Sequence, residues 1–423
     1  MPAPDEFSLR GIALPAFGPT ATWSIGVGAT IPVVALSARG LGASVAVAAA
    51  FVLIEGLSAF ASSLPAGSLV ARVGERRALV GAAVLDALGA ALAVVAQNLW
   101  VLGLAVALMG TTGSVFLLAR QSWLTARAPV HVRARAMSTM GGVQRIGLFV
   151  GPFVAAPVIV IWGTQAAYAV AVAAGLSAAV WAWFALRDDD LADVDAPPPM
   201  PAGGGRPRTA RSASQVRLVD VVRSHRRVLS TIGLGVVLIG IARQGRFIVV
   251  PLWAESVGVS SSGTAVIFGI AGAAEVLLFY PAGSVMDRFG RVWVAVPFLA
   301  VLGLGMVALP LTHGFVAVAV VSTVMGVGNG LGSGIVQTLG ADAAPVAGRA
   351  QFLSVWRFLS LIGQNGAPLL VSAVTVVASL GAASVVLGLV VLAGAPLLAR
   401  WLPAHDPRRR GPVPVDPNER LGP

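Results

Sequence analysis

Twelve long apolar runs follow one another along the chain, and they restrict its possible folds more than any other feature. Each run is close to the roughly 20 residues that a helix needs to cross the hydrocarbon core of a bilayer. Charged residues make up 11% of the sequence and the mean hydropathy is +0.85, whereas a soluble domain carries about a quarter charged residues. The sequence therefore predicts an all-α membrane protein. Helices are expected at 14–37, 44–66, 78–96, 100–124, 137–160, 165–186, 229–252, 262–282, 292–310, 315–340, 351–377 and 379–400.

An internal repeat relates the two parts of the chain. Matching positions differ by 216 residues without a gap, as in Pro65 and Pro281, Gln121 and Gln337, and Pro152 and Pro368. We interpret the repeat as a six-helix unit that is duplicated in the same orientation. The expected organisation is an N-terminal half at 1–186, a linker at 187–227, a C-terminal half at 228–401 and a tail at 402–423.

The linker and the tail are rich in proline, glycine and arginine, which predicts flexible or disordered segments. Residues 216–228 mix apolar side chains with arginines. This pattern fits a short interfacial helix on anionic headgroups and, equally, a solvated basic linker.

The distribution of basic residues indicates the orientation. All 29 basic residues are arginine, and about 23 of them fall in segments on one side of the predicted bundle, as the positive-inside rule requires of a cytoplasmic side. The net charge of +11 therefore reflects membrane topology rather than nucleic-acid binding. We expect a multi-pass protein of the inner (plasma) membrane with both termini in the cytoplasm.

Several functional classes are excluded by residues that the sequence lacks. Cysteine is absent, so disulfides and thiolate metal sites are ruled out. The four histidines lie in predicted loops and tails, and the chain has neither lysine nor a phosphate-binding loop, which disfavours a metal enzyme and direct use of ATP. We expect no enzyme activity, no metal and no cofactor. A transporter driven by a gradient, or by its substrate alone, remains.

The repeated segment that starts at Pro281 resembles the loop between helices 2 and 3 of the major facilitator superfamily, G-x-x-x-D-R-x-G-R-[RK]. Its glycine would let two helices approach closely, and its aspartate would cap a helix or hold an arginine. The second half matches at Gly283, Asp287, Arg288, Gly290 and Arg291, and the first half at Gly67, Arg72, Gly74 and Arg76, with Ala71 in place of the aspartate. The resemblance implies a twelve-helix transporter that works by alternating access.

Two acids of the second half have no counterpart in the first. Asp287 and Asp342 correspond to Ala71 and Ala126 at the 216-residue offset. We therefore expect a cytoplasmic gate whose charges lie mainly in the second half. Its members are Asp287, Arg288, Arg291, Asp342 and Arg349.

The fifth helix carries a second resemblance. Gly147, Gly151 and Pro152 are similar to the G-x-x-x-G-P antiporter motif of proton-coupled drug exporters, although Ala155 and Ala156 replace the glycines that complete it. Small residues allow close helix packing and the proline bends the helix, so packing alone is an equal alternative. The arginine that such exporters often carry in helix 4 is missing from 106–110.

Charged side chains inside the helices are the candidate functional residues, because such residues are costly in hydrocarbon. Glu275 and Arg145 lie at similar depths, about 12 Å from the inner end at 1.5 Å per residue. The resemblance implies that helix 5 packs on helix 8, and helix 2 on helix 11. We hypothesise two pairs across the interface, Glu275 with Arg145 and Glu55 with Arg357, that act either as proton-sensitive switches or as static bridges.

The remaining intramembrane charges have more than one interpretation. Asp86 is either a structural partner or part of the proton-coupling set, and Arg120 is expected to reach water at the inner end. The resemblance implies that helix 7 lines the central cavity. Arg243 and Arg246 are therefore expected to contact an anionic or hydrogen-bond-accepting substrate, to be partners of a proton-binding acid, to gate the outer side through Glu255 (in the case of Arg246), or to serve as structure. The expected cavity residues are Arg243, Gln244, Arg246 and Gln337.

The predicted function is secondary active transport, with proton-coupled efflux of a small organic compound such as a drug or metabolite as the preferred interpretation. Uptake or facilitated diffusion of a small organic anion is the first alternative. A non-transporting membrane sensor or assembly subunit is the second. The expected partners are a small-molecule substrate, protons and the lipid bilayer, without nucleic acid, and the protein is expected to be a monomer.

Overall fold

The computed structural model describes residues 9–127, 130–186, 218–345 and 349–405, and all regular secondary structure in these ranges is helical. The predicted all-α class is confirmed. The first half contains α1 (Leu9–Thr30), α2 (Val33–Gly40), α3 (Val45–Val73), α4 (Glu75–Val94), α5 (Leu99–Arg127), α6 (Val130–Trp162) and α7 (Ala167–Ala185). The second contains α8 (Leu218–Ser224), α9 (Arg226–Ser256), α10 (Ser261–Phe289), α11 (Val292–Ala308), α12 (Gly314–Leu331), α13 (Ile335–Ala343), α14 (Arg349–Val377) and α15 (Leu380–Trp401), and short 3-10 turns include η1 (Thr164–Ala166).

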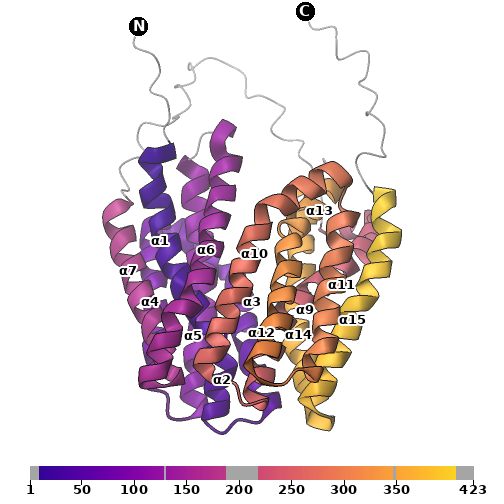
Figure 1. Cartoon of the computed structure of the whole chain (residues 1–423). Coiled ribbons are helices and arrows are strands. Elements are labelled where there is room, and N and C mark those ends of the chain that lie inside the picture. The colour runs from indigo at the N-terminus through magenta and orange to yellow at the C-terminus, as the bar shows by residue number, and fades with distance from the viewer. Residues whose placement is uncertain (1–8, 128–129, 187–217, 346–348, 406–423) are drawn as a thin grey trace, which may run out of the picture.

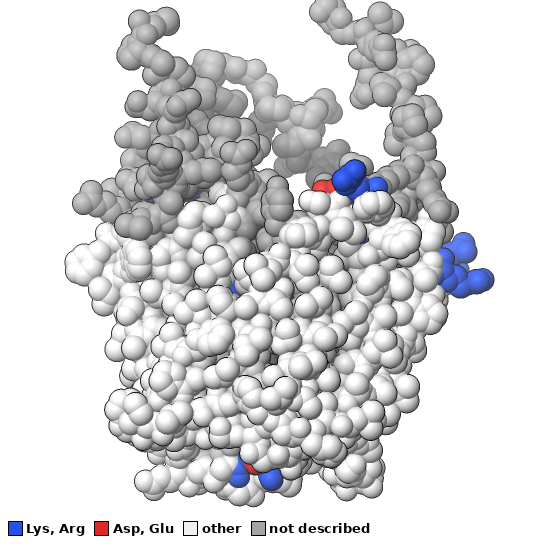
Figure 2. Space-filling view, in the orientation of Figure 1, with Lys and Arg blue, Asp and Glu red and all other residues white. Residues whose placement is uncertain are grey.

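Eleven described helices are long and apolar enough to span a membrane, and the bent pair α1 and α2 makes a twelfth candidate. Helix α1 begins and α15 ends at the same end of the bundle, which we call the arginine-rich end (Figure 1). Charged side chains gather near the two ends of the face in Figure 2, and the band between them is almost free of charge. This band is the surface expected to face lipid.

The predicted linker is described only at its C-terminal end. Residues 187–217 of the predicted linker and 406–423 of the predicted tail lie outside the described residues. From Leu218 the chain forms the short helix α8, whose Val221 is buried and which packs against α14. Residues 218–224 of this segment are therefore helical, and Val221 is turned toward the bundle.

The two halves form separate bundles that lie side by side (Figure 1). They meet where α6 packs against α10 and where α3 packs against α14, the two contacts that the resemblance implied. Glycines permit the close approach: a Cβ atom built on Gly272 of α10 would lie 3.4 Å from the Cα of Phe149 on α6. The backbones of α6 and α10 therefore approach each other closely at Gly272.

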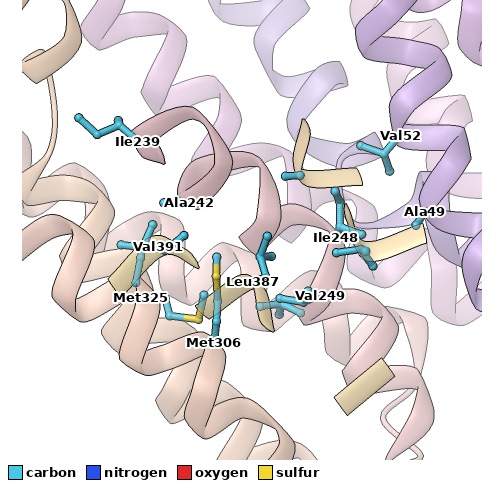
Figure 3. Close-up of a cluster of buried hydrophobic side chains, with 14 of the residues drawn as sticks. Ala49, Val52, Ile239, Ala242, Ile248, Val249, Met306, Met325, Leu387 and Val391 are labelled. Carbon is cyan, nitrogen blue, oxygen red and sulfur yellow. The ribbon is translucent and has the colours of Figure 1, made fainter. Parts of the chain in front are cut away.

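The 216-residue repeat persists in the packing. Gly89 packs on Met109 in the first half, and Gly305 packs on Met325 in the second. Matching residues of the two halves therefore occupy equivalent places. In the second half, Met306, Met325 and Leu387 gather around α9 (Figure 3), and Gly245 leaves room there for Leu387 and Met306.

The segments that start at Pro65 and Pro281 are more helical than expected. The sequence predicts turns over 67–77 and from 283, but α3 continues to Val73 and α10 to Phe289. Each helix ends at a glycine with positive φ, Gly74 at 88° and Gly290 at 101°. A backbone conformation of this kind suits glycine and few other residues, so the chain reverses at the second glycine of the motif.

Two predicted helices are broken. The helix expected at 14–37 bends by 41° between α1 and α2, because Pro32 lacks the N–H that would continue the ladder. The helix expected at 315–340 stops after α12 and resumes as α13, with Gly334 at a φ of +78°. Alternating glycines from Gly326 to Gly334 weaken the helix there. The first half has Phe116 and Leu118 where the second has Gly332 and Gly334, and α5 is continuous.

Candidate functional site

A pocket lies between the two halves near the middle of the bundle. Among its lining residues are Arg145, Arg246, Glu275, Phe149, Phe247 and Phe268, from α6, α9 and α10. The space open to the centre of a water-sized sphere is about 60 Å³, and one water needs roughly 10–15 Å³ by that measure. In this conformation the pocket accommodates a few waters rather than a drug-sized molecule, for which sites of about 300 Å³ or more are usual.

Glu275 is the centre of the pocket's charge network. Its Oε1 lies 3.3 Å from Arg145 Nη1 and its Oε2 lies 3.1 Å from Arg246 Nη2. The ion pair expected between Arg145 and Glu275 is thus present, and it joins the two halves. Asn329 of α12 lies near the same carboxylate and favours its charged form. A buried carboxylate needs such partners, because desolvation otherwise makes its charge very costly.

The break between α12 and α13 supplies further polar groups. A regular helix would occupy the Gly332 carbonyl, but here it accepts a hydrogen bond of 2.6 Å from Arg243 Nη2. The Ser333 hydroxyl accepts one of 2.7 Å from Arg145 Nη1. The sequence analysis missed both contacts, although the alternating glycines were a visible signal. The break between α12 and α13 therefore provides hydrogen-bond acceptors for Arg243 and Arg145 in addition to the carboxylate of Glu275.

The predicted cavity residues do not form one set. Arg246 lines the pocket, whereas Arg243 turns to Gly332 and lies over the ring of Phe298 at 5.4 Å. Gln244 is half-buried on α9 and Gln337 is exposed on α13, and neither lines this pocket. Of the four, Arg246 has the clearest position for contact with a substrate.

The contact expected between Arg246 and Glu255 is replaced by a different ion pair. Glu255 pairs with Arg39 of α2 at 3.1 Å, so it is not the partner of Arg246. Arg39 also donates to the Ala43 carbonyl at 2.6 Å. The sequence carried a signal for this pair, because Arg39 is the one arginine expected on the outer side and it differs from Glu255 by the repeat offset of 216. Hydrogen bonds from Thr164 to Ser261 and from Ser372 to Ala46 tie the halves at the same end.

The second predicted pair is not formed. Glu55 and Arg357, both within the described ranges, make no ion pair, and Arg357 is exposed. The reason is depth: Gly56 of α3 packs against Asn365 of α14, which lies eight residues beyond Arg357, or about 12 Å along the helix. Glu55 therefore lies level with Asn365 rather than with Arg357.

Asp86 is held by neutral donors. Trp23 Nε1 of α1 donates to its Oδ2 at 3.0 Å, and the hydroxyl of Thr112 on α5 lies 2.9 Å from its Oδ1. The side chain is buried, at 5% exposure. Arg120 is also buried and donates to Gln144 at 3.1 Å, so the expectation that it reaches water at the inner end is wrong for this conformation.

One ion pair is described within the predicted cytoplasmic gate. Arg291 binds Asp342 through two contacts of 2.8 and 3.3 Å, within the second half. Asp287 is exposed, and a Cβ atom on Gly283 would meet nothing within 4 Å. The close helix approach expected at Gly283 is therefore absent here.

Other members of the predicted gate contact residues outside it. Arg288 lies over the ring of Phe289, and Arg76 donates to the Trp183 carbonyl at 2.5 Å. Gly67 has open space except for Leu118 at 3.9 Å, Arg72 is exposed, and the side chain of Arg349 lies outside the described ones.

The glycines of the helix-5 motif form a packing surface for α1. A Cβ atom on Gly147 would lie 2.5 Å from the Cβ of Ser24, and Gly151 faces the backbone of α1 from Ile25 to Ala29. Pro152 lines the pocket. In this conformation the two glycines of the motif therefore allow α6 to pack closely against α1, in agreement with the packing interpretation.

Side chains that could bind a metal ion do not cluster in the described part of the chain. No group of three or more histidine, aspartate or glutamate residues is placed to hold a metal ion there. The candidate chemistry is thus that of charge pairs, protons and a pocket of mixed polarity.

Comparison with known proteins places this site in context. The model of the Major Facilitator Superfamily matches residues 20–240 and 232–421. The multidrug resistance proteins MdtG of Erwinia billingiae (strain Eb661) and Enterobacter lignolyticus (strain SCF1) are each 27% identical over 180 residues, which is 42% of this chain and 44% and 43% of those proteins. The match therefore spans less than half the length of these curated relatives.

Solved structures show the same fold. A POT family transporter in complex with a thioalcohol-conjugated peptide superposes with a TM-score of 0.76 at 14% identity, over 94% of this chain and 96% of that one. A POT family transporter in complex with 5-aminolevulinic acid gives a TM-score of 0.72 at 14% identity and the same coverage. At this identity the likeness concerns the fold alone. Since the family model covers almost the whole chain, the protein belongs to the major facilitator superfamily, a family of transporters rather than enzymes.

Proposed function

We propose that this transporter exports a small organic compound in exchange for protons and that Glu275 is the carboxylate that couples the two. One observation carries the proposal: Glu275 holds Arg145 of the other half and Arg246 of its own half on its two oxygens, inside the pocket. A group in that place controls both the interface and the space where a substrate would bind.

The coupling follows from charge. A proton on Glu275 removes the attraction to Arg145, and the contact between α6 and α10 loses its ion pair. Breaking a buried pair costs about 3–5 kcal/mol, which is enough to shift the balance between two conformations. A substrate that displaces Arg246 from Glu275 competes with the proton for the same carboxylate. Proton and substrate therefore favour different states of one interface, as alternating access requires.

The conformation fits a state that is closed on the outer side. Three polar contacts join the halves at the end opposite to the arginine-rich one. At the arginine-rich end, the pair of Arg291 with Asp342 stays within one half and Asp287 is exposed. With the arginine-rich end in the cytoplasm, by the positive-inside rule, this is a state from which a cytoplasmic compound would be collected.

Two further observations support export rather than uptake. The helix-5 motif resembles that of drug exporters, and the matched relatives are multidrug resistance proteins. The motif lies directly beside the site, because Arg145 is two residues before Gly147.

A second candidate is uptake or facilitated diffusion of a small organic anion, and the arginine excess favours it. Arg145 and Arg246 bind the carboxylate of Glu275, the charge of Arg243 acts on it as well, and the pocket walls include three phenylalanines. Three positive charges near one negative charge are costly at this depth, so an anion with an apolar body would complement the pocket. The two superposed POT structures contain a conjugated peptide and 5-aminolevulinic acid, which concerns those proteins.

The deciding experiment uses purified protein in proteoliposomes that enclose a pH-sensitive dye. Cationic, neutral and anionic compounds are added in turn to the wild type, to Glu275→Gln and to the control Asp220→Asn, which removes an exposed acid of α8 outside the pocket. A compound-evoked pH change that Glu275→Gln abolishes and Asp220→Asn keeps is the expected result. Flux of an anion without any proton movement would overturn proton exchange and support the second candidate.

A further inference from the structure

A second carboxylate lies deep in the first half, apart from the pocket. Asp86 of α4 is 5% exposed and contacts Trp23 of α1 and Thr112 of α5. The proposed coupling through Glu275 does not use it. A buried ionised carboxylate normally has a cation beside it or several donors around it, and both of the donors at Asp86 are neutral.

The charged and titratable groups on the neighbouring helices supply no cation at this depth. Helix α4 packs mainly against α5 and α7, and more lightly against α3 and η1. Glu55 of α3 interacts with Asp86 as a like charge, and α7 contributes Tyr168, while α1 contributes Trp23 and η1 has no titratable residue. The nearest arginine on α5, Arg120, is eight residues from Thr112, about 12 Å along the axis, and binds Gln144.

The hydrogen bonds available to the Thr112 hydroxyl indicate that Asp86 is protonated. The Thr112 hydroxyl has one hydrogen but lies within bonding distance of three oxygens: Asp86 Oδ1 at 2.9 Å, the Leu108 carbonyl at 2.9 Å and the Met109 carbonyl at 3.1 Å. The carbonyls can only accept, and the hydroxyl oxygen itself can accept one more bond. If Asp86 carries a proton on Oδ1, it donates to Thr112, and Thr112 donates to its own helix. Trp23 donates to Oδ2, and each group is then satisfied.

The internal repeat provides a matched comparison within the same chain. At the 216-residue offset, Asp86, Trp23 and Thr112 correspond to Leu302, Ile239 and Gly328. Leu302 and Ile239 are fully buried, and Gly328 packs on Leu302. The fold therefore fills this position with apolar side chains in the second half. Packing alone does not require an acid there, and a buried acid is costly.

We propose that Asp86 is a second proton-binding site, which holds its proton in this conformation by donating Oδ1–H to Thr112 Oγ1. Loss of the proton leaves a carboxylate among Trp23, Thr112 and Glu55, so ionisation requires α1, α4 or α5 to admit water. Trp23 is followed by Ser24, which packs on Gly147 of α6. A change of charge at Asp86 therefore acts on the helix pair that carries Arg145.

Infrared spectroscopy of the purified protein in lipid tests the proposal without a transport substrate, so its result does not depend on the direction or the coupling proposed above. The readout is the carbonyl stretch of a protonated carboxylic acid at neutral pH and its shift in heavy water. We expect this band in the wild type and in the control Glu55→Gln, and its loss in Asp86→Asn. An absent band, or one that survives Asp86→Asn unchanged, would overturn the proposal.

Stability gives a second, independent readout. Asparagine reproduces the protonated acid, because its oxygen accepts from Trp23 and its amide donates to Thr112. Asp86→Asn should therefore unfold within about 2 °C of the wild type at neutral pH. Thr112→Val removes the acceptor and should shift the band rather than abolish it. A large loss of stability in Asp86→Asn would show that Asp86 is ionised, and an unshifted band in Thr112→Val would show that Asp86 does not donate to Thr112.

Discussion

The charge network at Glu275 makes an ordered prediction for three substitutions. Glu275→Gln leaves both Arg145 and Arg246 without their carboxylate. Arg246→Gln removes the more buried arginine, with 5% of its side chain exposed against 24% for Arg145. Arg145→Gln leaves Glu275 paired with Arg246. The loss of stability should therefore be largest for Glu275→Gln, intermediate for Arg246→Gln and smallest for Arg145→Gln.

The magnitudes follow from the geometry. At separations of 3.3 and 3.1 Å and an effective dielectric constant near 20, each pair attracts with about 5 kcal/mol before desolvation is counted. Desolvation offsets much of this. Removal of one partner of a buried pair costs about 3–5 kcal/mol, the value expected for Glu275→Gln. For Arg145→Gln we expect about 1–3 kcal/mol, as for a lost hydrogen bond to a charged group.

The assay is reversible unfolding in mixed micelles, applied to each single variant and to the double variant Arg145→Gln with Glu275→Gln. The double-mutant cycle should give a coupling energy of about 1–3 kcal/mol for residues in direct contact. Glu255→Gln is the matched control, and because its ion pair is half exposed, with side-chain exposures of 32% and 35%, it should cost about 1 kcal/mol or less. Additive losses in the cycle, or a control as damaging as Glu275→Gln, would refute the reasoning.

Three further outcomes test the fold around the site. Gly334→Ala places a side chain at a φ of +78° and should cost about 1–2 kcal/mol, measured by denaturant unfolding; an unchanged midpoint would mean that the break does not need this conformation. Gly147→Val should overpack the contact of α6 with α1 and lower the free energy of unfolding by about 1–3 kcal/mol. Gly141→Val, where a Cβ atom would meet nothing within 4 Å, should leave the free energy of unfolding nearly unchanged. Equal effects of the two substitutions would contradict the packing described. Arg39→Glu should speed labelling of an engineered cysteine at the outer end, and the swap of Arg39→Glu with Glu255→Arg should restore protection; labelling that ignores the swap would rule out an outer gate at this pair.

Depth counting along the helices succeeded for one pair and failed for the other. The rise per residue placed Arg145 level with Glu275, and the two side chains are in contact. The same count did not match Glu55 with Arg357, because the contact of α3 with α14 joins Gly56 to Asn365. Depth is a local property of one helix, whereas the register between two helices depends on which residues permit their close approach.

Broken helices account for most of what the sequence analysis missed. The predicted spans at 14–37 and 315–340 were treated as continuous, and both contain a break. The second break exposes the Gly332 carbonyl and the Ser333 hydroxyl, which then hold Arg243 and Arg145. Pro32 and the alternating glycines before Gly334 were visible signals, but residue types alone did not show where the freed groups would point.

By itself, the sequence determined that the chain is an all-α membrane protein built from two repeated halves. Apolar length, arginine bias and the constant offset are properties of the chain that need no contact between distant segments. Only the tertiary structure decided that Glu275 binds two arginines, that Arg39 meets Glu255 and that Asp86 has neutral hydrogen-bonding partners. Those contacts depend on helix rotation, on interhelical register and on backbone breaks, and small residues far apart in the sequence set them jointly.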